Sequence, residues 1–164
     1  MATHLKGLSD FTHLEVHSAK PFTFGIVVAQ WNVAITGALY DGAYQLLLDK
    51  GALPENIKTI QVPGSFELTS GADILLQDSS INAVICLGCV IQGETRHFDF
   101  ICDAVANGIT NVSLKYNKPV IFGVLTTDNQ KQAEERAGGL HGNKGEEAAI
   151  TAIQMAKIHS DLIK

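Results

Sequence analysis

Basic residues are sparse in this chain of 164 residues. Lysine and arginine together number 12, against 17 aspartates and glutamates, which gives a formal net charge of -5 at pH 7. Proteins that bind nucleic acids neutralise phosphates with clustered lysine and arginine, and the sequence shows no basic stripe of that kind. The charge balance therefore argues against nucleic acid as the main partner.

Long apolar runs are also lacking. The beginning of the chain contains no stretch that could form the core of a signal peptide, and no later segment reaches the roughly 18 continuous apolar residues of a membrane span. We therefore expect a soluble, cytoplasmic protein without a membrane partner.

Cysteine is scarce, with three residues in the whole chain. An odd number does not make a disulfide framework and is typical of a reducing compartment. Cys86 and Cys89 form a CxxC motif, but residues three apart in a strand point to opposite faces. A metal site would also need a second pair of ligands, so we predict two buried, small apolar side chains and no metal.

A substantial core is what the sequence does contain. Hydrophobic residues make up 46% of the composition, which suits one globular domain, assigned here to residues 21–164. Residues 1–20 have little apolar pattern, and the spacing of His4, His13 and His17 does not converge on a metal. We interpret them as an N-terminal arm.

Apolar runs alternate with segments of helical spacing through that domain. The predicted strands are 22–29, 57–62, 83–91 and 120–125, and the predicted helices are 33–50, 66–77, 97–115, 130–137 and 144–162, with a glycine-rich loop at 138–143. Apolar strands that alternate with helices are typical of a parallel sheet covered on both faces. The expected fold is an α/β fold with three α/β/α layers, a four-stranded parallel sheet and a flavodoxin-like arrangement.

The carboxyl ends of such strands are where open parallel sheets bind ligands. The residues expected there are Trp31 and Asn32, Gly64 to Glu67, Val90 to His97, and Phe122 to Asn129. We expect these segments to share one site.

The turn at 93–95 favours an anion as ligand. A glycine turn before a helix exposes backbone N–H groups, and Thr95 can cap the helix or offer its hydroxyl to an anion. Arg136 and Lys144 flank the glycine-rich loop and would supply two cations for a phosphate monoester. Because neither a Walker A motif nor a GxGxxG loop is present, a nucleotide is disfavoured.

A histidine follows the turn at the start of the next predicted helix. His97 is a candidate general acid and base, because imidazole titrates near neutral pH and Glu94 and Asp99 are close enough in sequence to orient it. A purely local hydrogen-bonding role is the alternative. His141 competes for the catalytic role from within the glycine-rich loop, where solvation alone would also explain it.

Aromatic residues also mark the strand ends. Trp31 and Phe66 lie just beyond predicted strands, where a flat ring could stack on a planar heterocycle, although packing against the core would explain them equally well. The pattern of its strand predicts Phe122 to be a core residue. Glu67 suits a helix start through the helix dipole alone.

Four motifs, VPGSFELT, GCVIQGETRHFDFI, FGVLTTDN and RAGGLHGNKGEEAA, occur in this order. At these intervals they resemble lumazine synthase, the riboflavin-pathway family that makes 6,7-dimethyl-8-ribityllumazine, from about residue 22 to the C-terminus. The resemblance implies condensation of 5-amino-6-ribitylaminouracil with 3,4-dihydroxy-2-butanone 4-phosphate. Phosphate and water are released, and neither a metal nor an organic cofactor is needed.

The resemblance also implies roles for individual residues. His97 would be the catalytic proton carrier, and Glu147 would orient it. The residues implied for the pyrimidine and its ribityl chain are Trp31, Asn32, Gly64, Ser65, Phe66, Glu67, Cys89, Val90 and Ile91. Those implied for the butanone phosphate are Glu94, Thr95 and, from the next subunit, Arg136 and Lys144, with Phe122 of that subunit closing the aromatic side.

Assembly is a further implication, because the family's sites lie between subunits of a homopentamer that in many members forms a sixty-subunit icosahedral shell. Two residues depart from the family pattern. Leu140 stands where a lysine is usual, which removes a cation near the phosphate, and Arg96 stands where a smaller polar residue is common. Two alternatives on this scaffold remain open, a non-catalytic flavin- or lumazine-binding shell protein and an archaeal-type riboflavin synthase.

Overall fold

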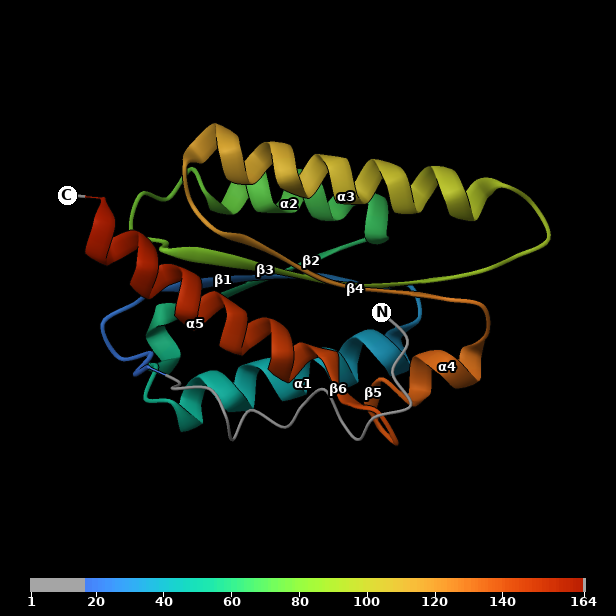
Figure 1. The fold of residues 1–164 in the computed structure, drawn as a ribbon, viewed down its shortest axis with the longest axis horizontal. Coiled ribbons are helices and arrows are strands. Elements are labelled where there is room, and N and C mark those ends of the chain that lie inside the picture. Colours follow the sequence, from blue (N-terminus) through green and yellow to red (C-terminus); the bar gives the residue numbers. More distant parts are fainter. Residues whose placement is uncertain (1–16, 164) are drawn as a thin grey trace.

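A four-stranded parallel sheet forms the centre of the protein, in a computed structural model that describes residues 17–163. The strands are β1 (Phe24–Ala29), β2 (Ile57–Val62), β3 (Ala83–Ile91) and β4 (Val120–Thr127), in the order β2-β1-β3-β4 (Figure 1). The predicted parallel sheet is confirmed, and its strand order is the flavodoxin-like one.

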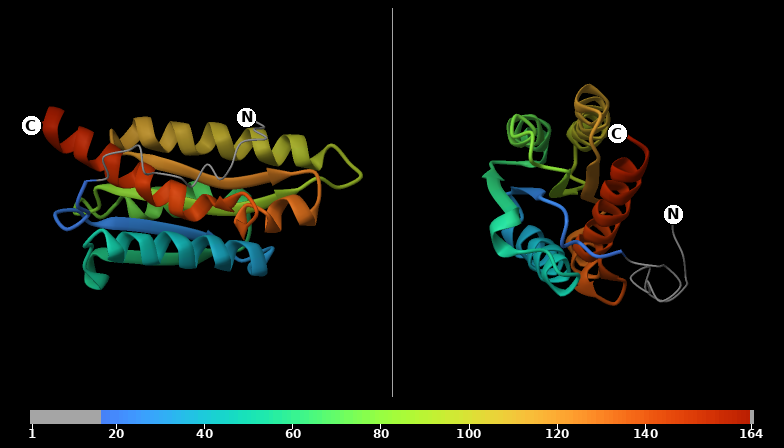
Figure 2. Two further views of the ribbon diagram at one scale, coloured as in Figure 1. Left: turned by 60° about the horizontal axis from the view of Figure 1, so that its bottom comes forward. Right: turned by 90° about the vertical axis from the view of Figure 1, so that its left-hand side faces the viewer.

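Helices cover both faces of this sheet. On one face lie α1 (Val33–Asp49), the short α4 (Gln130–Glu134) and α5 (Lys144–Leu162), and on the other lie α2 (Leu68–Leu75) and α3 (His97–Tyr116), as Figures 1 and 2 show. Short 3-10 turns, Pro54–Asn56 and Ser65–Glu67, precede β2 and α2. The predicted three-layer arrangement is confirmed.

The two central strands explain why the sequence reads as continuous apolar runs. Every residue of β1 is buried, and β3 is buried up to its last two residues. Alternate side chains of these strands enter the two cores, so that Phe24 and Ile85 pack with α1 and α5, whereas Val27 and Val84 pack with α2 and α3.

The edge strands behave differently, and one prediction fails there. Phe122 was predicted to be a core residue from the apolar run of its strand, but its side chain is 43% exposed. Because β4 lies at the edge of the sheet, the helices do not cover it completely, and Ile121, Phe122 and Thr126 are not buried.

Several boundaries match the predictions, and others shift. Those of β2, β3 and α5 are the predicted ones, whereas α2 ends at Leu75 and α4 at Glu134, both earlier than predicted. The loop predicted at 138–143 contains a small antiparallel hairpin, β5 (Ala137–Gly139) and β6 (Gly142–Asn143).

Only the last part of the predicted N-terminal arm is described. Ala19 is fully buried in the core, and its N–H donates to the Lys50 carbonyl at 2.9 Å. His4 and His13 lie outside the described residues. Within residues 17–163, the helices do not combine the length and the apolar character that crossing a bilayer requires.

Candidate functional site

All four parallel strands end at the same edge of the sheet, on the right in Figure 1, where the chain enters α1, α2, α3 and α4. The segments predicted to share a site therefore lie at one edge. Apart from Phe122 and the turn at 92–97, the candidate residues form two groups of different construction.

The first group, called the aromatic half, consists of Trp31, Asn32, residues 64–67 and residues 89–91. Two of its loops are attached to one backbone carbonyl of the sheet, that of Cys89. The Asn32 side-chain nitrogen Nδ2 donates to it at 3.0 Å, and the Ser65 hydroxyl donates at the longer distance of 3.5 Å. The ends of β1, β2 and β3 are thereby linked.

Trp31 projects from this framework into solvent. Asn32, the next residue, has a left-handed backbone with φ 59°, which asparagine tolerates better than most residues. The Trp31 N–H donates to the Pro63 carbonyl at 3.1 Å, and the ring packs on Gly64, where an added Cβ would lie 2.9 Å from the ring carbon Cε3. The side chain of Trp31 is nevertheless 68% exposed, so one surface of the indole is free for a planar ligand.

The turn after β2 presents a second exposed ring. Phe66 is 55% exposed, while the carboxylate of its neighbour Glu67 accepts the Gly64 N–H at 3.0 Å. Glu67 therefore fixes the turn that holds Phe66. Val90 and Ile91, at the end of β3, are half-buried.

The cysteines of β3 are buried free thiols, as predicted. Burial raises the pKa of the Cys86 thiol to about 12 and that of Cys89 to about 11. Neither thiol is ionised near neutral pH, so Cys89 contributes its backbone carbonyl to the framework and no reactive thiolate.

The turn between β3 and α3 is open to solvent. Its first residue, Gln92, donates its N–H to the Thr127 carbonyl at 2.8 Å, whereas Gly93, Glu94 and Thr95 are exposed, and a Cβ at Gly93 would meet nothing within 4 Å. Thr95 Oγ1 accepts the His97 N–H at 3.4 Å. The turn therefore has room for an anion beside the start of α3.

His97 is exposed and is the first residue of α3. The residue before it, Arg96, is directed along the helix, where its guanidinium lies 3.6 Å from the Asp99 carboxylate and 5.7 Å from the centre of the Phe100 ring. The Arg96 side chain is nevertheless 82% exposed.

The second group, called the cationic half, consists of Arg136, the hairpin β5–β6, Lys144 and Glu147. The hairpin pairs Ala137 with Asn143, and the Lys144 N–H donates to the Arg136 carbonyl at 2.9 Å. The two cations predicted to flank a loop are thus neighbours across a hairpin. Leu140, where the resemblance implies a lysine, is 78% exposed near the hairpin turn.

Internal bonds hold both cations of this half. The Arg136 guanidinium nitrogen Nη1 donates to the Gln132 carbonyl at 2.9 Å, and the Lys144 ammonium lies 2.5 Å from the Glu147 carboxylate. Because α5 and α3 cover opposite faces of the sheet, Glu147 and His97 belong to different layers of one chain. The predicted orientation of His97 by Glu147 stays a prediction.

Sequence reasoning overlooked Asn143, whose side chain links the hairpin, α5 and α1. Its Oδ1 accepts the Gly145 N–H at 2.8 Å, and its Nδ2 donates to the Ala38 carbonyl at 2.9 Å. An asparagine directly before a helical segment is a known capping signal and would have identified the first of these bonds. The second depends on the packing of helices that are distant in sequence.

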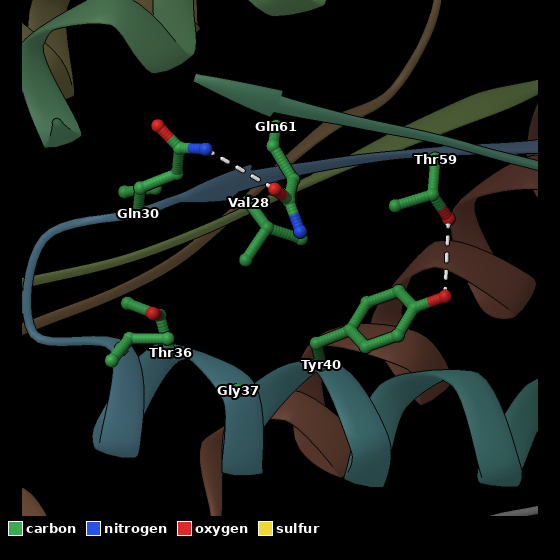
Figure 3. Close-up of a pocket in the computed structure, with 9 residues that line it drawn as sticks. Val28, Gln30, Thr36, Gly37, Tyr40, Thr59 and Gln61 are labelled. Carbon is green, nitrogen blue, oxygen red and sulfur yellow. Dashed lines mark hydrogen bonds between the residues drawn. The ribbon is translucent and has the colours of Figure 1, made fainter. Parts of the chain in front are cut away.

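A cavity of about 310 Å³ lies near the aromatic half, between α1 and the strands β1 and β2 (Figure 3). Gln30 Nε2 donates to Gln61 Oε1 at 3.2 Å, and the Thr59 hydroxyl donates to the Tyr40 hydroxyl at 3.4 Å beside it. Its other lining residues are Val28, Ala29, Val33, Thr36 and Gly37. This lining contains neither the predicted proton carrier nor the predicted phosphate ligands.

Among residues 17–163, histidine, cysteine and acidic side chains do not form groups of three or more that could hold a metal ion.

Comparison with known proteins gives the same family as the sequence motifs. Residues 21–160 match the family model described as 6,7-dimethyl-8-ribityllumazine synthase. A protein of that name from Cytophaga hutchinsonii is 59% identical over 94% of this chain and 97% of its own length. Those of Parabacteroides distasonis and Flavobacterium johnsoniae are 52% and 51% identical, over 94% and 96% of this chain and 97% and 83% of their own lengths. The match covers both halves of the candidate site, and the chain belongs to the 6,7-dimethyl-8-ribityllumazine synthase family of enzymes.

Proposed function

We propose that the protein condenses 5-amino-6-ribitylaminouracil with 3,4-dihydroxy-2-butanone 4-phosphate to 6,7-dimethyl-8-ribityllumazine, releasing phosphate and water without a metal or organic cofactor. The main support is the position of His97. It is exposed at the start of α3, beside an open turn, at the sheet edge where Trp31 and Phe66 are also exposed.

The aromatic half binds the pyrimidine in this proposal. The indole of Trp31 stacks on the planar ring, and Phe66 bounds the same space. Asn32, Gly64, Ser65 and Glu67 shape the loops that receive the ribityl chain. The end of β3, Cys89 to Ile91, lies under the ring.

His97 moves the protons of the reaction. The substrate amine attacks the ketone, and loss of water from the adduct gives a Schiff base. Phosphate then leaves, and attack by the second amine closes the ring with loss of another water. Every step requires a proton to be taken from nitrogen or carbon, or delivered to a leaving hydroxyl. A positioned imidazole typically contributes a factor of about 10² to 10⁴ in rate to such steps.

The phosphate binds between the open turn and the cationic half of a neighbouring copy. Backbone N–H groups at Glu94 and Thr95 and the Thr95 hydroxyl approach it from one side. Arg136 and Lys144 approach from the other, and Glu147 of the same neighbour orients His97. Phe122, exposed on β4, closes the aromatic side from that neighbour.

The layer arrangement supports a site shared between two copies. His97 begins a helix on one face of the sheet, and the cationic half is built on the other face. Large apolar side chains such as Ile74, Phe100 and Leu114 are exposed on α2 and α3, which is typical of surfaces that associate. We therefore propose a homopentamer as the basic assembly and an icosahedral shell of sixty subunits as its larger form.

Light scattering measures this assembly directly, since the subunit mass is 17.6 kDa. A pentamer or a multiple of it is expected. A monomer that turns over substrate would contradict a site shared between copies. A cytoplasmic location completes the proposal and is supported by the three free thiols.

The decisive experiment follows the fluorescence of the lumazine product with both substrates present. His97→Ala is expected to lower kcat about 10²- to 10⁴-fold, although positioning alone leaves some residual rate. His159→Ala is the matched control, because His159 bonds the Asn117 carbonyl at the end of α3 remote from His97.

Three results would contradict the proposal. They are the absence of product with the wild type, undiminished turnover by His97→Ala, and a larger loss with His141→Ala than with His97→Ala. Conversion of lumazine alone to riboflavin would indicate the riboflavin synthase alternative. Tight lumazine binding without turnover would indicate a shell protein.

A further inference from the structure

Asn143 lies between the two cations of the cationic half. It is the last residue of β6, it pairs with Ala137 beside Arg136, and it precedes Lys144. Its side chain is mostly buried, with 9% of the residue exposed. The bond from the Gly145 N–H to Asn143 Oδ1 caps α5 and fixes the direction in which that helix begins.

The same side chain also contacts α1. The Asn143 nitrogen Nδ2 donates to the Ala38 carbonyl. The side chain lies so close to α1 that a Cβ added at Gly42 would be 2.5 Å from this nitrogen. Gly145 approaches α1 even more closely, since a Cβ there would lie 1.9 Å from the Leu39 carbonyl oxygen. Two glycines from helices distant in sequence thus make room for this contact.

Capping and attachment to α1 have different consequences. A cap alone orients α5, but the bond to Ala38 also fixes where the hairpin and the start of α5 lie relative to the sheet. Because the Lys144 N–H donates to the Arg136 carbonyl, a displacement of Asn143 would move the backbone of both cations together.

We propose that Asn143 is a positioning residue that holds Arg136 and Lys144 at the place where the substrate phosphate binds. This inference rests on the proposed function for the identity of the substrate. Two cations that must grip one phosphate tolerate little displacement, and a misplacement of about 1 Å can cost about 100-fold in rate.

Two variants break the attachment in different ways. Asn143→Ser keeps an oxygen that can cap α5 but lacks the amide that reaches Ala38. Gly42→Ala leaves Asn143 unchanged and forces its side chain away from α1. Both are expected to raise the KM for the butanone phosphate about 10- to 100-fold. The KM for the pyrimidine should stay within about twofold, because the aromatic half is attached to the sheet instead.

Gly37→Ala is the matched control for Gly42→Ala. It makes the same chemical change on the same helix, and its Cβ would meet nothing within 4 Å. Both KM values should equal those of the wild type. Light scattering and urea unfolding of all variants show whether assembly and fold are retained, and Asn143→Ser decides the matter if Gly42→Ala does not fold.

Calorimetric titration with inorganic phosphate separates this inference from the proposed function. Weaker phosphate binding by Asn143→Ser and Gly42→Ala than by the wild type supports the positioning role, even if the wild type makes no lumazine. Unchanged phosphate binding and unchanged KM values would overturn it. An equal rise in both KM values would also overturn it, because that result indicates a general structural role.

Discussion

The two halves of the candidate site are held in place by different physical means. Loops of the aromatic half are attached through Asn32 and Ser65 to one carbonyl of the sheet, that of Cys89. The cationic half is held by close packing on α1, which requires glycine at positions 42 and 145. Hydrogen-bonded loops tolerate small changes in volume, whereas a packed helix contact does not tolerate one added carbon. The two halves should therefore respond differently to mutation.

The largest expected effect is on stability and concerns Gly145. In Gly145→Ala the new Cβ would collide with the Leu39 carbonyl oxygen, so we expect the free energy of unfolding to fall by about 3 kcal/mol or more. Gly93→Ala, in the open turn, should change it by less than about 0.5 kcal/mol. Urea unfolding measures both. Equal stability of the two variants would mean that α5 does not depend on this contact.

A second prediction separates the halves by substrate. Arg136→Ala should raise the KM for the butanone phosphate about 10- to 100-fold, because a charged hydrogen bond is worth about 1.5 to 3 kcal/mol. Trp31→Ala should instead raise the KM for the pyrimidine about tenfold, as expected for the loss of ring stacking. Steady-state kinetics with each substrate varied in turn measures both effects.

Lys131→Ala serves as the control for the loss of a cation. Lys131 lies on α4, near Arg136 in sequence. Its side chain is exposed and makes only a weak ion pair with Glu135, at 4.0 Å, so its removal should leave both KM values unchanged. If Arg136→Ala and Trp31→Ala raised the same KM, the division of the site into two halves would be wrong.

The last prediction concerns pH and the strand beneath the aromatic half. Burial raises the pKa of Cys86 to about 12, above its ordinary value of 9.0. Between pH 9 and 12 the Cys86 thiol is deprotonated in the unfolded chain but protonated in the folded chain. The contribution of this group to the free energy of unfolding is therefore fully present below pH 9 and is lost as the pH rises toward 12. One such group contributes a slope of about 1.4 kcal/mol per pH unit. Cys86→Ala should unfold with a shallower pH dependence, and identical slopes would contradict the prediction.

The sequence predicted most of the fold because its strongest patterns are local. The segment of β2, the apolar run of β3 and the amphipathic spacing of α5 have the boundaries that the structure shows. It also placed Trp31, Phe66 and His97 at strand ends on one edge of the sheet, since parallel strands that alternate with helices leave few other arrangements.

The features that the sequence could not predict depend on contacts between segments that are distant along the chain. The exposure of Phe122 follows from the edge position of β4, which no property of the run at 120–125 reveals. The hairpin of β5 and β6 is too short and too rich in glycine to have a hydrophobic period. The contact of Asn143 with Ala38 joins residues from opposite ends of the domain.

The strand order also has a consequence for how the chain folds. Strands that pair in the main sheet are separated along the chain by at least one helix, as in the pairing of Phe24 with Ala83. No turn can bring two of these strands together early, so the chain must close long loops before the sheet gains a stabilising ladder. Folding is therefore expected to be slower than that of a helical bundle of similar length, and the edges of β2 and β4 stay unpaired meanwhile. Low protein concentration during refolding leaves this interval unchanged but slows association between partly folded chains, so it should favour the native fold over aggregates.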